Sequence, residues 1–576
     1  MTVRVLLDCE FPRTLDAWVN ELLPRRGARF EGWLFEDIAA RRAAESRLRA
    51  AGVTARFHSA YKPLMHHFLE HVEREGLAHV TVHYPVHPDA APRRFALEAY
   101  PLAEWVGAAA LSMLPKAADR GLPVYRVELL WRDGRRRTDT VAAPNRVHTD
   151  HLGETLLSPT AWRDGASCEC DFEAVFCTAM TCLQRHPWPE SEPYFERLDI
   201  RVDLPGIAWA PPDESGWMDS HEALHEDLYF SLLEVFQRRS DRPTGDRGLR
   251  PGQIVPDVRS SDGPVRLRIT LGPHAPLPAD VDSADRTPLR DTVAPLAPAR
   301  IVRELDSIAG ERFGATSAQG RAVRGVYRRG SGPAVLISAA QHANETSGVV
   351  GALRAAQQLA ARPDAHFALI ALENPDGYSL HQALCLQAPR HMHHAARYTA
   401  LGDDLEYREA PPLHERAARE RALALSGARL HINLHGYPAH EWTRPLTGYI
   451  PRGFELWTLP KGFFLIVRHH AGWAAQARAL AEHVCRALAR QTHLMGFNAA
   501  QRASYNAHAG DLPYEVIHGT ACMISEVNRP GSAALTLITE FPDETIYGDS
   551  FILAHDTQTA AVLAAVDAMG HISPNP

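Results

Sequence analysis

Short apolar runs and longer amphipathic stretches alternate along most of this 576-residue chain. Near the N-terminus the apolar runs VRVLLDC, HVTVHYPV and VYRVELLW have the length and alternation of β-strands. Between and after them, IAARRAAESRLRAA and HEALHEDLYFSLLEVFQ carry apolar residues at helical spacing. Strands mixed with helices in this way predict an α/β or α+β region.

The second half of the chain alternates more regularly. A helix is predicted over ARIVRELDSIAGERF, and strands are predicted at AVRGVYRR and AVLISAA. Helices then separate further strands at HFALIALEN, ARLHINLHG, ACMISEV and ALTLITE, and a last helix covers AHDTQTAAVLAAVDAM. Strands separated by helices of this length predict an α/β fold with a mixed, mostly parallel twisted sheet flanked by helices.

Composition changes between these two halves. From residue 241 to 297 the chain is rich in Pro, Gly, Asp and Arg, as in DRPTGDRGLRPGQ. Such segments bury too little apolar surface to fold alone and are typical of linkers, although VRLRITL within this segment has the alternation of one strand. The chain is far longer than a typical single domain, so more than one domain is expected. We therefore predict an N-terminal region of unknown role over residues 1–240, a linker over 241–297, and a second domain over 298–576.

Composition and charge exclude several classes of protein. Hydrophobic residues make up 45% of the chain and charged residues 23%, which is typical of a globular protein. The net charge of −8 lacks the basic footprint of a nucleic-acid binder, and nothing indicates membrane insertion. The N-terminal apolar run is interrupted by Asp8 and Glu10, unlike a secretory signal. Eight cysteines without CxxC spacing favour a reducing, cytoplasmic compartment. A small molecule or peptide is the expected partner.

Residue types that bind metals stand where several predicted strands end. His342 and Glu345 follow AVLISAA, His435 ends ARLHINLHG, and Glu540 ends ALTLITE. In parallel sheets, ligands bind at the carboxyl ends of the strands. Two His and one Glu are a standard set for a catalytic zinc ion that keeps an open position for water. The sequence therefore predicts one Zn²⁺ per chain, held by His342, Glu345 and His435.

A second histidine competes for the third ligand position. Along ARLHINLHG the apolar residues alternate with His431, Asn433 and His435, so that His431 and His435 face the same side of the sheet. We favour His435 because it stands at the end of the strand beside Gly436, where the following loop leaves room for metal and substrate.

Five short segments, in this order, resemble the zinc carboxypeptidases related to carboxypeptidase A. ATSAQGRAVRGVYRR resembles the family's S-x-x-G-R approach to the first strand, and QHANE resembles its H-x-x-E zinc motif. ENPDGY, LHGY and TEFPDETIYG resemble its Asn-Pro-Asp-Gly turn, its third-ligand segment and its terminal strand. The resemblance runs from Ile301 to the C-terminus. It implies a carboxypeptidase-like mixed sheet between helices and a zinc metallopeptidase that hydrolyses a peptide.

The resemblance also implies roles for further residues. Glu540, followed seven residues later by Tyr547 and Gly548 as in the family, would act as general base and then acid, with Glu526 as the alternative. Arg390 would stabilise the oxyanion, with Arg397 as the alternative. The residues expected to bind substrate are Asn374, Arg408 and Tyr514.

One segment departs from the family's pattern. Carboxypeptidases carry an Asn-Arg pair that grips the terminal carboxylate of the substrate. In GDDLEYRE, Asp404 is present, but Glu406 and Tyr407 occupy the Asn-Arg positions and Arg408 follows one place late. Either Arg408 substitutes for the missing arginine, or the enzyme does not read a free terminal carboxylate, which Glu406 would repel.

Two alternative functions are consistent with these residues. HANET also resembles the H-G-N-E segment of deacylases of the succinylglutamate desuccinylase and aspartoacylase kind, which act on small amides with the same zinc triad. The second alternative is a non-catalytic binding module. A complete ligand set with a candidate base counts against that second alternative.

Overall fold

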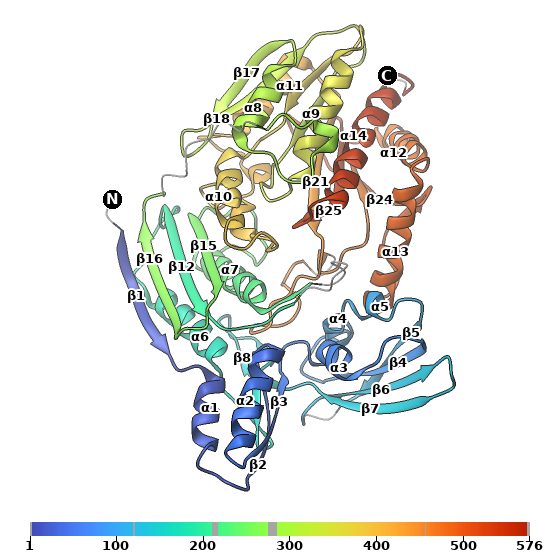
Figure 1. Cartoon of the computed structure of the whole chain (residues 1–576). Coiled ribbons are helices and arrows are strands. Elements are labelled where there is room, and N and C mark those ends of the chain that lie inside the picture. The colour runs from blue at the N-terminus through green and yellow to red at the C-terminus, as the bar shows by residue number, and fades with distance from the viewer. Residues whose placement is uncertain (1–2, 119–120, 210–216, 275–284, 455–456, 573–576) are drawn as a thin grey trace.

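The computed structural model describes residues 3–118, 121–209, 217–274, 285–454 and 457–572 (Figure 1). Its N-terminal part forms three four-stranded sheets, and its C-terminal part forms one nine-stranded sheet. Helix α7 (Ser220–Arg239) lies in the middle of the molecule, between the two parts (Figure 1). No helix within these described ranges is long and apolar enough to cross a membrane.

Helices pack against the N-terminal sheets. The first has the strand order β1-β16-β12-β15 and packs against α6 and α7, the second has the order β11-β10-β2-β3, and the third has the order β5-β4-β6-β7. The elements of this part are β1 (Arg4–Phe11), α1 (Thr14–Leu22), β2 (Arg29–Leu34), α2 (Ile38–Ala50), β3 (Thr54–Ser59), α3 (Pro63–His71), β4 (Leu77–Val86), α4 (Arg94–Glu98), α5 (Leu102–Trp105), β5 (Ala110–Ala117), β6 (Val124–Trp131), β7 (Arg136–Ala142), β8 (Asn145–Thr149), β9 (Thr155–Pro159), β10 (Ala161–Arg163), β11 (Ala166–Cys168), α6 (Asp171–Arg185), β12 (Arg197–Leu204), β13 (Ala208–Trp209), β14 (Met218–Asp219), α7, β15 (Gln253–Ser260) and β16 (Val265–Gly272).

The predicted linker over residues 241–297 needs correction. Its residues 253–272 form β15 and β16, which pair with β12 and complete the first sheet. In β16, buried Leu267 and Ile269 alternate with exposed Arg266 and Arg268. This alternation outweighs the linker-like composition around it, because one buried face is enough to hold a strand in a sheet.

The nine-stranded sheet is mixed rather than mostly parallel. Its strand order is β17-β18-β20-β19-β21-β25-β22-β24-β23. The central strands β20, β19, β21 and β25 are parallel, whereas β22 runs antiparallel to β25 and both edges are antiparallel. The strands are β17 (Glu311–Thr316), β18 (Ala322–Arg328), β19 (Val335–Ala339), β20 (Phe367–Ile370), β21 (Leu430–Pro438), β22 (Phe464–His469), β23 (Glu515–Ile517), β24 (Thr520–Glu526) and β25 (Leu535–Glu544).

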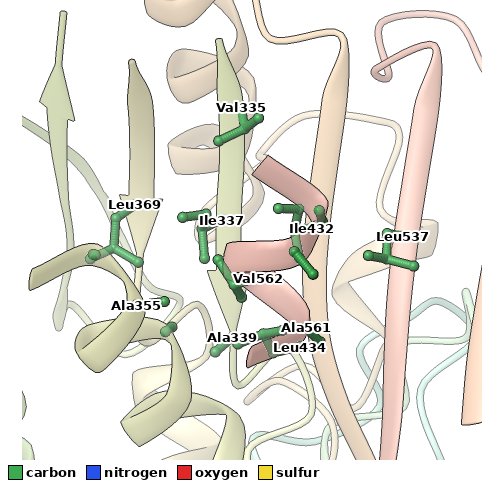
Figure 2. Packing of buried hydrophobic residues seen from close by; sticks show 14 of the residues in the cluster. Val335, Ile337, Ala339, Ala355, Leu369, Ile432, Leu434, Leu537, Ala561 and Val562 are labelled. Carbon is green, nitrogen blue, oxygen red and sulfur yellow. The ribbon is translucent and has the colours of Figure 1, made fainter. Parts of the chain in front are cut away.

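Helices cover both faces of this sheet. On one face, Ile337, Ile432 and Leu537 pack against Ala355 of α9 and Val562 of α14 (Figure 2). On the other face, α11 covers the strands nearest β17. The helices of this part are α8 (Pro298–Asp306), α9 (Ser347–Ala360), α10 (Pro375–Cys385), α11 (Arg416–Ser426), α12 (Ala474–Leu488), α13 (Thr492–Ala509) and α14 (Asp549–Met569), with short 3-10 turns at Leu289–Asp291, His394–Ala396 and Leu405–Tyr407.

The alternation along β21 decides which side chains reach the site. Ile432 and Leu434 lie in the core beneath α9 and α14 (Figure 2). Since successive residues of a strand point to opposite faces, His431, Asn433 and His435 point to the face that α9 and α14 leave uncovered. The predicted alternation is therefore present, and it directs these polar residues away from the main core.

Candidate metal centre and active site

Three side chains converge at the end of the central parallel strands. His342 Nδ1 lies 2.8 Å from Glu345 Oε1, His435 Nδ1 lies 2.9 Å from Glu345 Oε2, and the two Nδ1 atoms are 3.2 Å apart. All three residues are buried. They are the group among the described residues whose donor atoms lie close enough together to hold a metal ion.

The surrounding contacts fit a zinc ion at this position. His342 directs its other ring nitrogen, Nε2, to Asp404 Oδ2 at 3.2 Å, which is the carboxylate contact that orients many metal-binding histidines. Although burial raises the pKa of Glu345, His342, Arg397 and His435 hold it well below its usual range, so that Glu345 is a carboxylate. Two imidazole nitrogens and one carboxylate, close together and facing one another, are a standard donor set for zinc.

The residue after His435 packs closely against a side chain of β25. That residue is Gly436, and a Cβ atom at Gly436 would lie 1.8 Å from Asp543 Oδ1 on β25. Asp543 in turn accepts hydrogen bonds from the backbone N–H of Ser347, at the start of α9, and from its hydroxyl. The glycine therefore allows β21, β25 and the segment carrying Glu345 to approach one another.

Glu540 lies on the strand next to His435. The two residues are register partners between the parallel strands β21 and β25. Both Glu540 and His435 line the same cavity of about 120 Å³. Glu540 Oε2 is buried and has no hydrogen-bond partner among the described residues. Burial and the charge of Glu345 raise the pKa of Glu540 well above its usual range.

The two alternatives for these positions are engaged elsewhere. His431 Nε2 contacts the hydroxyl of Ser338 at 2.8 Å and stands outside the three-residue group. Glu526, at the end of β24, accepts a hydrogen bond from Asn528 and does not line the cavity. The geometry therefore favours His435 and Glu540 over His431 and Glu526.

Of the two candidate arginines, the structure brings Arg397 to the site. Its Nη1 donates to Glu345 Oε1 at 2.8 Å and to Glu544 Oε1 at 3.3 Å, and its buried Nε has no partner among the described residues. Arg390 lines a different cavity, together with His440. The prediction for Arg390 relied on its place in the chain after the Asn-Pro-Asp-Gly turn, and the fold of residues 386–397 places Arg397 there instead.

The residues expected to bind substrate have other contacts. Arg408 is buried and donates to Thr399 Oγ1 at 2.7 Å and to Asp403 Oδ1 at 2.5 Å, so it does not replace the missing arginine. Asn374 caps α10, since its Oδ1 accepts from the N–H of Gly377 at 2.9 Å. Neither residue lines the metal-site cavity.

Tyr514 lies beside the site rather than in it. Its ring centroid is 5.5 Å from that of Phe464, in an apolar cluster on the uncovered face of the sheet. Burial, Tyr505 and Glu540 raise the pKa of its phenol, which places the ring within electrostatic reach of Glu540. Its hydroxyl has no hydrogen-bond partner in the described part of the chain.

Lys461 is a buried cation close to Glu540 that sequence reasoning missed. Its ammonium group lies 4.6 Å from the ring centroid of Tyr437 and 5.4 Å from those of Trp457 and Phe464. Burial lowers its pKa to about 7, while Glu540 opposes that shift. In the sequence, Lys461 stands in a loop of Pro, Gly and aromatic residues, and nothing in that pattern shows which strand it approaches.

The N-terminal part contributes to the cavity walls. Arg247, from the predicted linker, lines the cavity, and its Nη1 lies 4.0 Å from Asp404 Oδ2. His394 also lines the cavity, and its Nδ1 lies 2.5 Å from Glu226 Oε2 on α7. These contacts join residues far apart in the chain, so sequence spacing carried no signal for them.

Helix α7 holds the loops of the C-terminal part through buried acids. Its face contacts two segments, residues 391–394 and 440–447. The contacts join Asp219 to His391 at 3.1 Å, Glu222 to His440 at 2.7 Å, Asp227 to the N–H of Leu446 at 2.6 Å, and Glu234 to Arg444 at 2.6 Å. Because Trp442 between these contacts lines the cavity, α7 supports one of its walls.

Helix α7 also contains the sequence His-Glu-Ala-Leu-His, a spacing known from zinc proteins. Here His221 contacts Asp219 and the carbonyl of Leu204, and Glu222 contacts His440. The two histidines are not part of a metal-binding group among the described residues. The motif belongs to the contact between the two parts of the chain.

No protein-family model matches this sequence, and no curated protein matches it. Solved structures similar to the chain include putative metallopeptidases and metallo-carboxypeptidases. One, from Burkholderia cenocepacia, is 13% identical and covers 53% of this chain and 76% of its own, with a TM-score of 0.30. Another, from Pseudomonas aeruginosa, is 17% identical and covers 54% of this chain and 76% of its own, with a TM-score of 0.28. TM-scores this low carry no weight for function, which is therefore inferred from the geometry of the site.

Proposed function

We propose that the chain is a zinc-dependent hydrolase that cleaves a peptide or amide bond, most closely in the manner of a metallocarboxypeptidase. The observation that carries this proposal is the convergence of His342, Glu345 and His435 beside Glu540, a buried carboxylate with one oxygen that has no partner among the described residues. Zinc, when bound, would polarise a carbonyl group and lower the pKa of a water molecule.

Residues of the chain would supply proton transfer and stabilisation of the developing charge. Glu540 would accept a proton from water at Oε2 and pass it to the leaving nitrogen, as a general base and then acid. Burial raises its pKa above the usual range of a carboxyl group, which makes the ionised side chain a stronger base. Arg397 would hold the developing negative charge on the substrate oxygen through its Nε–H, since a fixed cation needs no reorganisation during the reaction.

A second candidate function is hydrolysis of small N-acyl amino acids. The cavity volume of about 120 Å³ favours it, because this volume suits a small molecule better than a long peptide.

The test combines metal content with a substrate panel. We expect about one zinc ion per chain by elemental analysis, lost in His435→Ala and kept in His431→Gln, a variant on the same strand and face. Glu540→Gln should keep zinc and lose a factor of about 10²–10⁴ in kcat. Wild type without zinc, or His431→Gln losing zinc while His435→Ala keeps it, would contradict the assignment.

The panel then separates the two candidates. It contains unblocked peptides, the same peptides amidated at the C-terminus, and N-acetyl amino acids. Cleavage of unblocked peptides alone supports a carboxypeptidase, and turnover of N-acetyl amino acids supports a deacylase. No hydrolysis of any member by the zinc-loaded chain would favour a binding module.

A further inference from the structure

Glu406, which stands where the family carries asparagine, is surrounded by arginines. Arg419 and Arg529 both contact its carboxylate closely, Arg416 lies 3.6 Å from it, and Arg468 lies 4.0 Å from it. These arginines come from α11, β22 and the loop between β24 and β25, so three separate elements converge on one carboxylate. We refer to Arg416, Arg419, Arg468, Arg529 and Glu406 as the arginine cluster.

The arginine cluster carries an excess of positive charge. Arg419 also pairs with both oxygens of Glu373, at 2.9 and 2.5 Å, and this second carboxylate neutralises it. Three guanidinium groups then face the single carboxylate of Glu406, which leaves two positive charges uncompensated. Glu406 therefore does not repel an anion, in contrast to the expectation from its sequence position, because its own charge is already matched.

Two members of the cluster have donors available to a ligand. The Arg468 side chain is 33% exposed, and its guanidinium makes no hydrogen bond to the described residues. Arg529 uses one terminal nitrogen, Nη1, to contact Glu406, and leaves Nη2 without a hydrogen bond within the described ranges. A guanidinium fork with free N–H groups is well suited to a carboxylate.

The cluster and the metal centre share one cavity. Arg468, Arg529 and Arg247 line it together with His435 and Glu540. Trp442, Phe454 and Trp457 form an aromatic part of the lining, and Arg247 lies 5.3 Å from the ring of Phe454. An anion bound by the cluster would thus belong to the molecule whose bond lies at the metal centre.

We propose that the arginine cluster binds a dicarboxylate group of the substrate, with Arg468 and Arg529 as the contacting residues. The inference rests on the proposed function for its link to catalysis, but the binding itself does not require zinc. Two uncompensated charges match the two carboxylates of a dicarboxylic amino acid on the leaving side of the cleaved bond. A dicarboxylic acyl group would offer one free carboxylate, because its other carboxyl forms the cleaved bond.

The test measures binding of succinate, succinamate and succinamide to the full chain by titration calorimetry, before and after removal of metal with a chelator. These probes have nearly the same size and carry two, one and no negative charges. We expect affinity to fall in that order with and without metal. Succinate affinity should fall at least about tenfold in Arg468→Gln and in Arg529→Gln, and it should weaken as salt is raised.

Arg478→Gln is the matched control, since Arg478 is an exposed arginine on α12 that lies outside the cavity. Thermal unfolding of each variant shows whether it is folded, and two separate variants guard against the failure of one. Equal affinity for succinate and succinamide would overturn the proposal. So would succinate binding that neither Arg468→Gln nor Arg529→Gln weakens. If the chain contains no zinc as purified but still binds succinate, the result would support the arginine cluster and contradict only the proposed hydrolase.

A kinetic comparison distinguishes the two sides of the bond. N-acetylglutamate carries the dicarboxylic residue on the leaving side, and N-succinylalanine carries an extra carboxylate on the acyl side. N-acetylalanine, which has one carboxylate, is the reference substrate. We expect Arg468→Gln to raise KM for either N-acetylglutamate or N-succinylalanine by a factor at least about ten times larger than its effect on KM for N-acetylalanine. An equal effect on all three substrates would contradict recognition of a dicarboxylate.

Discussion

His394 Nδ1 lies 2.5 Å from Glu226 Oε2, so a carboxylate of the N-terminal part contacts a histidine in the wall of the metal-site cavity. Both side chains are buried, and they belong to segments on opposite sides of the predicted linker. The hydrogen bonds of two other α7 acids, Glu222 with His440 and Glu234 with Arg444, tie the N-terminal part to the loops around the candidate active site. The two parts of the chain are therefore expected to unfold together.

Arg444 provides a test of that coupling. It is 1% exposed, and it donates to Glu234 at 2.6 and 3.1 Å. Arg444→Met would remove one buried partner of Glu234, which keeps its contacts with Arg452 and His151, at a cost of about 1–3 kcal/mol in the free energy of unfolding. Urea unfolding followed by circular dichroism measures this loss. Arg478→Met, which removes an exposed ion pair, should cause no measurable change, and equal losses in the two variants would contradict the coupling.

Asp404 is expected to tune metal binding through His342. Asp404→Asn keeps the size of the side chain but removes the charge that faces His342 Nε2. Outer contacts of this kind are worth about 10–100-fold in metal affinity, so zinc should bind that much more weakly. Competition with a fluorescent chelator measures the affinity. Asp403→Asn serves as the neighbouring control, because Asp403 contacts Arg408 and Thr399 instead.

The pH dependence of the reaction should report on Lys461 and Glu540. Glu540 acts as a base when ionised, so kcat/KM should fall as the pH drops through its raised pKa. The positive charge of Lys461 lowers that pKa, and this charge is present mainly below its own pKa of about 7. Lys461→Met should therefore move the acid limb to higher pH, while the profiles should converge above pH 7.

Steady-state kinetics over a range of pH values tests this prediction. Lys116→Met, which alters an exposed lysine of β5, should leave the profile unchanged. An acid limb that stays in place in Lys461→Met, or that moves to lower pH, would show that Lys461 does not act on Glu540.

Gly436→Ala should disturb the metal centre without touching a ligand. The added Cβ would meet Asp543 Oδ1, and Asp543 holds the start of α9 through Ser347. We expect weaker zinc binding and a loss of about 1–3 kcal/mol in the free energy of unfolding, as for overpacking of a core. Gly496→Ala is the matched control, because a Cβ at Gly496 meets open space. Unchanged zinc affinity in Gly436→Ala would contradict the close-approach explanation.

The sequence predicted those parts of the fold in which local pattern and tertiary context agree. Helix α2 and strands β6 and β21 lie within a few residues of their predicted positions, because their apolar spacing matches the face they bury. The predicted helix ARIVRELDSIAGERF ends at Asp306, and its last residues enter β17, where pairing with β18 outweighs helical propensity. The antiparallel insertion of β22 beside β25 was also missed, since strand order depends on contacts between distant segments.

In the candidate site, too, the sequence predicted the residues whose positions follow from local pattern and missed those whose contacts depend on the tertiary fold. His342, Glu345, His435 and Glu540 stand at the ends of predicted strands, so local spacing was enough to bring them together. The arginines and acids around them come from several separate segments, and their partners depend on the tertiary fold. Arg408 illustrates the limit: its position next to the expected pair made it a candidate, but Asp403 and Thr399 occupy it.

The register between β21 and β25 limits where the chain can accept insertions and deletions. Leu537 of β25 lies in the main core and Glu540 faces the cavity, on the opposite side of the same strand. A one-residue deletion within Leu535–Thr539 would exchange the two faces, burying a carboxylate under α14 and turning apolar side chains towards the metal ligands. Insertions between Pro530 and Ala534 leave that alternation intact. Length variation is therefore expected in the connecting loop and not in the strand.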